Sequence, residues 1–134
     1  MAAPTPDFLA GVPLFEGVSK KELSQIADAM VERSWRAGDV ISVEGGPQAV
    51  SFFVIESGTV DVEVGGSPRR SMGPGDHFGE VSLLGGTERT ATLTAATNVH
   101  AYGLTPWTFL PMVKSNATIS FRLFETIGER LAAD

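Results

Sequence analysis

Apolar residues recur with a helical period near the start of the chain. Within residues 19–30, SKKELSQIADAM, the apolar positions fall at i, i+3, i+4 and i+7, which is the spacing of one helix face. These positions are Leu23, Ile26, Ala27 and Met30. Ser19 followed three residues later by Glu22 is a capping-box pattern. The sequence therefore predicts an amphipathic helix here.

From Trp35 to Leu104 the pattern changes to short β-type runs separated by turns that contain Gly, Pro or Asp. In TVDVEVGG, valines alternate with Asp61 and Glu63, as in a half-buried strand. The runs cover residues 36–46, 49–58, 59–66, 71–80, 89–95 and 98–104. Many short strands with regular turns are typical of a sandwich or a β-roll.

A helical pattern returns after Leu104 in TPWTFLPMVKSN, where Pro111 cannot lie deep inside a helix. Either this helix begins at Thr105 and bends, or Thr108 caps it and Pro111 falls in its first turn. A longer helix is expected from Ser115 or Asn116. Its apolar stripe comprises Ile119, Leu123, Phe124, Ile127 and Leu131. Four aromatic residues of these helices are expected in the core or at a docking surface: Trp107, Phe109, Phe121 and Phe124.

The predicted fold class is mainly β with flanking helices (α+β): an antiparallel β-roll or jelly-roll with N-terminal helices and two C-terminal helices. A chain of 134 residues with 43% hydrophobic and 19% charged residues fits one folded domain. We expect an N-terminal helical segment over residues 1–34, the β-roll over 35–104 and the C-terminal helices over 105–134.

The net charge of −6 argues against a nucleic-acid-binding surface and against a polybasic membrane contact. The sequence contains no cysteine, which fits a reducing compartment. The first residues lack the charged and apolar regions of a secretory signal, and the apolar run at 50–55 is too short to span a bilayer. A cytoplasmic protein is expected.

One stretch, HFGEVSLLGGTERTATLTA (residues 77–95), departs from the strand pattern. Gly79 precedes consecutive backbone N–H groups that a short turn can direct at an anion. Gly85 and Gly86 let a loop close, and Arg89 then supplies a forked guanidinium suited to a phosphate or carboxylate. Glu80 either pairs with Arg89 or accepts hydrogen bonds from hydroxyl groups. A ligand with one phosphate and one ribose hydroxyl would satisfy both side chains.

These residues resemble the phosphate-binding cassette of the cyclic nucleotide-binding domain family: Phe-Gly-Glu, a short apolar turn, a loop, then Arg, two small residues and a strand. The cassette would cover residues 78–91. Elsewhere, RAGDVISVEGG resembles the family's early strand and turn, and SFFVIESGTVDV its hairpin. FLPMVKSNATISFRLFETIGERLA resembles its closing helix pair.

The resemblance implies that Glu80 accepts hydrogen bonds from the ribose 2′-hydroxyl and that Arg89 pairs with the cyclic phosphate. Backbone N–H groups would hold the phosphate and ribose, at Gly79, Val81, Ser82 and Ala91. Family members often close the pocket from the final helix, and Arg130 is the candidate lid here, through stacking of its guanidinium plane.

Two positions depart from the common pattern. Thr90 follows the arginine where cAMP-binding members often have Ala or Ser. In some cGMP-binding members a threonine there contacts the purine 2-amino group, so Thr90 leaves the base identity open. Glu88 stands where proline is frequent, and it is either a solvated loop charge or a competitor for Arg89.

The resemblance implies a noncatalytic sensor domain that binds cAMP, with cGMP as the alternative, and relays occupancy to the C-terminal helices. His77 and His100 without a third ligand make a weak metal site, so neither a metal nor another cofactor is expected. No output domain fits after Leu131, and we expect either a stand-alone protein that contacts a protein partner or a domain of a larger protein. A ligand-free scaffold or dimerisation module with an unused pocket is the rival function. A separate alternative is that Glu80 and Arg89 form only a structural ion pair that joins a loop to a strand.

Overall fold

The computed structural model of the chain describes residues 3–46, 51–85 and 89–133. The helices are α1 (Pro6–Ala10), the 3-10 helix η1 (Pro13–Phe15), α2 (Lys20–Ala29), α3 (Glu80–Gly85), α4 (Pro106–Ser115) and α5 (Ala117–Ala133). The strands are β1 (Val31–Trp35), β2 (Val40–Ser42), β3 (Phe52–Ser57), β4 (Val60–Val64), β5 (Ser67–Met72), β6 (His77–Phe78), β7 (Thr92–Ala95) and β8 (Val99–Leu104). This order of helix, β-core and helix confirms the predicted fold class.

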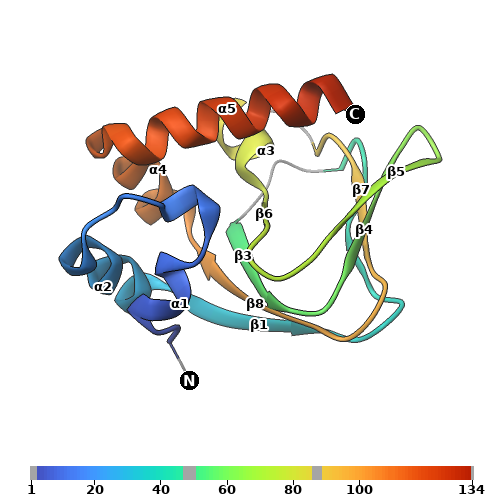
Figure 1. Ribbon diagram of the computed structural model, residues 1–134. Helices are drawn as coiled ribbons and strands as arrows, with labels where there is room; N and C mark the ends of the chain where they lie inside the picture. Colours follow the sequence, from blue (N-terminus) through green and yellow to red (C-terminus); the bar gives the residue numbers. More distant parts are fainter. Residues whose placement is uncertain (1–2, 47–50, 86–88, 134) are drawn as a thin grey trace.

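The strands form two antiparallel sheets of four, in the orders β1-β8-β3-β6 and β2-β7-β4-β5. Helices α1, α2 and α4 gather at one end of the roll, while α5 runs across the top and over α3 (Figure 1). The last turns of α5 thus reach toward the strands of the second sheet.

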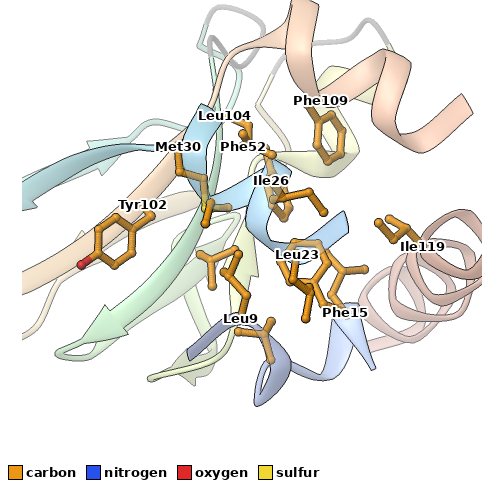
Figure 2. Packing of buried hydrophobic residues seen from close by; sticks show 14 of the residues in the cluster. Leu9, Phe15, Leu23, Ile26, Met30, Phe52, Tyr102, Leu104, Phe109 and Ile119 are labelled. Atoms are coloured by element: carbon orange, nitrogen blue, oxygen red, sulfur yellow. The ribbon is translucent and has the colours of Figure 1, made fainter. Parts of the chain in front are cut away.

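Strand β3 is buried on both faces, which explains its continuous apolar run. Successive side chains of a strand point to opposite faces. Phe53 and Ile55 belong to the core between the two sheets, whereas Phe52 and Val54 belong to a second core beneath the helices. Figure 2 shows side chains of this second core, where Phe52 lies among residues from α2, α4 and α5. The phenyl ring of Phe52 stacks on that of Phe109, with 4.6 Å between centroids.

Local capping defines the helix ends as predicted. The hydroxyl oxygen of Ser19 accepts the backbone N–H of Glu22 and thereby caps α2. Helix α4 begins after Thr105, which confirms the start given by the first alternative, whereas Pro111 lies inside the helix, contrary to expectation. The side-chain oxygen of Asn116 accepts the N–H of Ile119 at 3.1 Å and begins α5.

Two expectations differ from the structure. Strand β1 begins at Val31, four residues before the predicted change at Trp35, because its mostly exposed positions give a weak apolar signal. Phe124 does not widen the buried stripe of α5, since it is 78% exposed, and Leu131 is also exposed. Of the four C-terminal aromatic residues Phe109 is in the core, as expected, and the docking-surface alternative stays a prediction for the exposed ones, Trp107, Phe121 and Phe124.

Candidate functional site

A cavity of about 250 Å³ lies between the second sheet, helix α3 and the end of α5. The structure brings all eight residues of the predicted ligand site to its wall: Gly79, Glu80, Val81, Ser82, Arg89, Thr90, Ala91 and Arg130. These residues come from the turn between β6 and α3, from α3, from the segment before β7 and from α5. Their individual ligand roles stay predictions.

The turn between β6 and α3 requires glycine at position 79. Gly79 has a φ of +97°, a conformation that side chains with a Cβ rarely adopt. A Cβ at Gly79 would also lie 2.5 Å from the backbone oxygen of Ser51. The glycine therefore lets the chain pass close to β3 and enter α3 with Glu80 facing inward.

The Glu80 carboxylate is buried, with only 1% of the side chain exposed. Its Oε1 accepts a hydrogen bond from the Arg130 guanidinium, and its Oε2 lies 3.3 Å from Nδ1 of His77. Burial raises the pKa of Glu80, but the contact with His77 and the charge of Arg130 outweigh it and hold the pKa below its usual value. The carboxylate is therefore held ionised at the cavity wall.

Arg130 connects α5 to the part of the site formed by β5, β6 and α3. Besides Glu80, its guanidinium donates to the backbone oxygen of His77 and lies 3.6 Å from the sulfur of Met72. Only 14% of its side chain is exposed. The sequence suggested Arg130 for stacking on a ligand, whereas in this structure it neutralises the carboxylate expected to hold the ribose.

Arg89 does not pair with Glu80, so the interpretation of these two residues as a structural ion pair is wrong. No ion pair of Arg89 occurs within residues 3–46, 51–85 and 89–133. Its backbone is fixed by hydrogen bonds with Gly45 and Gly46, and burial lowers the pKa of its guanidinium. Gly86 and Glu88 lie outside the residues that the structure describes.

The part of the cavity wall outside the cassette was not predicted from the sequence. It is largely apolar and comprises Val62, Val64, Met72 and Leu93, with Arg70 from β5 as a second cation. Arg70 pairs in register with Val62 of β4. The alternation of the β4 valines was the available signal for the apolar wall, but Arg70 becomes part of it only through the β4–β5 pairing.

A second polar cluster lies in the other sheet, on β1, β3 and β8. Nδ1 of His100 is 2.8 Å from the carboxylate of Glu56, and its Nε2 is 3.1 Å from that of Glu32. The Tyr102 hydroxyl also donates to Glu56, at 2.8 Å. Burial opposes the charge of His100, but the hydrogen bonds to Glu32 and Glu56 outweigh it and raise its pKa. Burial and the bond to Glu56 raise the pKa of Tyr102 to about 12.

Two features are absent from the described residues. They contain no group of three or more His, Cys, Asp or Glu residues placed to hold a metal ion. None of their helices combines the length and the apolar character needed to cross a membrane.

A β-roll with a cavity lined by a cassette glutamate and arginine defines a class of ligand-binding regulatory domain. The sequence model described as cyclic nucleotide-binding domain matches residues 32–116, and the chain belongs to this family. A cAMP-dependent protein kinase regulatory subunit of Colletotrichum orbiculare is 37% identical over 100 residues, which are 73% of this chain and 25% of that protein. The corresponding subunit of Dictyostelium discoideum is 32% identical over 124 residues, 89% of this chain and 38% of that protein.

Solved structures agree on the fold. The cAMP-bound fragment 141–441 of PfPKA-R superposes with a TM-score of 0.82 at 24% identity, covering 96% of this chain and 46% of that one. The chain spans well under half the length of the curated relatives it matches. It is a cyclic nucleotide-binding domain like those of kinase regulatory subunits.

Proposed function

We propose that the chain is a noncatalytic sensor domain that binds cAMP in the cavity beside α3, with cGMP as the alternative ligand. The cyclic phosphate pairs with Arg89, and the ribose 2′-hydroxyl donates to Glu80. The purine lies against the apolar wall of β4 and β7. The curated relatives are named as cAMP-dependent, which supports cAMP as the first ligand to test.

The observation that carries this proposal is the separation of the two cassette charges. Glu80 is neutralised by Arg130, whereas Arg89 has no ion pair among the described residues although it is half-buried. A partly buried cation on a cavity wall favours an anionic ligand, because desolvation of an unpaired charge costs free energy. A forked guanidinium suits the two free oxygens of a cyclic phosphate.

The proposed relay runs through Arg130. A ribose hydroxyl that takes Oε1 of Glu80 competes with the guanidinium that now holds it, and the end of α5 then loses its contact with the cavity. A ligand can shift α5 only by the difference in its affinity for the two arrangements. A protein partner, such as the catalytic subunit of a kinase, would respond to that change in the helices.

The base identity depends on two polar residues of the wall. Guanine presents two acceptors, O6 and N7, to a bidentate arginine, whereas adenine presents a donor beside its N7. Arg70 and Thr90 both line the cavity, and this keeps cGMP as the alternative ligand.

Calorimetric titration of nucleotide-free protein with cAMP and cGMP tests the proposal, with Arg89→Ala as the decisive variant. Loss of the cation leaves a buried phosphate unpaired, which costs about 3–5 kcal/mol. The affinity should fall about a hundredfold to several thousandfold. Arg69→Ala is the matched control, because Arg69 lies on β5 but outside the cavity wall and should bind like the wild type.

Two results would overturn the proposal. Absence of binding to either nucleotide by folded wild-type protein would leave the scaffold function standing. Equal weakening by Arg89→Ala and Arg69→Ala would mean that the phosphate does not lie at Arg89.

A further inference from the structure

His77 is a buried histidine that the proposed binding scheme does not use. It is 5% exposed and lies in β6, three residues before Glu80. Its Nδ1 and the facing Oε2 of Glu80, 3.3 Å apart, are buried polar atoms with no hydrogen-bond partner in the described part of the chain. Buried polar atoms are nearly always paired, so this pair requires an explanation.

The charges around Glu80 balance only while Arg130 remains. The carboxylate and the guanidinium cancel, and His77 faces the remaining carboxylate oxygen. A ribose hydroxyl is a neutral donor, so when it replaces Arg130 it leaves a buried negative charge. The nucleotide phosphate does not restore the balance, because its own charge pairs with Arg89.

We propose that His77 is a positioning residue for Glu80 and couples nucleotide binding to the uptake of one proton. This inference rests on the proposed function. When the ribose displaces Arg130, the imidazole takes a proton from the solvent, and the imidazolium holds Oε2 through Nδ1–H. Imidazole is the side chain whose charge ordinarily changes between pH 5 and 8.

The surroundings of His77 permit this uptake. Its ring packs against Phe52 of β3, with 5.3 Å between centroids. This contact restrains the orientation of the imidazole toward Glu80. His77 also lines a second cavity of about 550 Å³, between α5 and the turn before β6, which gives solvent a route to it. The charged residues around that cavity are Arg70, Asp76, Arg122, Glu125, Glu129 and Arg130.

The test is calorimetry of the whole chain with the nucleotide that binds, between pH 6 and 8, in buffers of different ionisation enthalpy. The wild type should take up a proton, and its affinity should rise about tenfold from pH 8 to pH 6. His77→Gln keeps a neutral donor and should bind with no such pH dependence. His100→Gln removes the other histidine of the chain, in the other sheet, and should retain the full dependence.

The 2′-deoxy nucleotide separates this linkage from a general effect of pH. It cannot displace Arg130 from Glu80, so it should bind more weakly and without proton uptake. Binding of the natural nucleotide with no proton uptake, or the same uptake by His77→Gln, would overturn the role of His77 and leave the proposed function intact. Absence of any nucleotide binding would overturn the proposed function and this inference with it.

Discussion

Replacement of Arg130 by methionine tests whether the ion pair with Glu80 anchors α5 in the unliganded domain. Methionine keeps much of the side-chain volume but leaves a 1%-exposed carboxylate without its cation. Removing one partner of a buried pair costs about 3–5 kcal/mol. Arg130 is slightly exposed and His77 remains beside Glu80, so we expect a loss near the lower end, about 3 kcal/mol.

Urea denaturation followed by circular dichroism measures this loss in the free energy of unfolding. With an unfolding entropy of about 2.1 cal/mol/K per residue, 3 kcal/mol lowers the Tm of a 134-residue chain by about 10 °C. The double variant Glu80→Gln, Arg130→Met should recover much of the stability, because the uncompensated charge is gone.

Arg122→Met is the control on the same helix. Arg122 pairs with Glu16 at 3.7 Å, and the Glu16 side chain is 72% exposed. Exposed pairs contribute about 0–1 kcal/mol, so this variant should change stability little. A loss for Arg130→Met no larger than that for Arg122→Met would refute the anchoring role, as would a failure of Glu80→Gln to compensate.

Two further predictions concern other charged groups. The folded-state pKa of His100 is raised by its pairs with Glu32 and Glu56. These pairs therefore stabilise the domain fully below the unfolded pKa of about 6.5. Their contribution, about 1 kcal/mol, is lost as the pH rises through the folded pKa. His100→Gln should abolish this part of the pH dependence of urea unfolding, and an unchanged profile would contradict it. Arg70→Gln should lower the affinity for cGMP relative to cAMP about tenfold in paired titrations, whereas an equal loss for both would mean that Arg70 does not contact the base.

Much of the fold was predictable because its signals are local. The alternation of the β4 valines, the capping pattern before α2 and the sharp turn at Gly79 each depend on a few neighbouring residues. The cassette was predictable for the same reason, since its glycine, glutamate and arginine lie within 11 consecutive positions, Gly79 to Arg89.

The remaining features depend on which distant segments meet. Arg130 is 50 residues from Glu80 and reaches it only because α5 crosses above α3 (Figure 1). Phe124 fits the apolar period of α5 as well as Leu123 does, yet only Leu123 faces the core. A periodic pattern sets the direction of an apolar stripe, but the packing of the neighbouring elements sets its width.

Glu80, the proposed ribose acceptor, lies where both C-terminal helices make contact with the β-roll. Arg130 joins Glu80 to α5, while the imidazole of His77 packs on Phe52, which also stacks on the ring of Phe109 in α4. These two connections differ in kind. The Arg130–Glu80 ion pair can be displaced by a hydroxyl group, whereas the packing of His77, Phe52 and Phe109 changes only if the rings move. Under the proposed binding scheme we therefore expect the nucleotide to release the end of α5 before it disturbs α4, because Phe109 of α4 is fully buried.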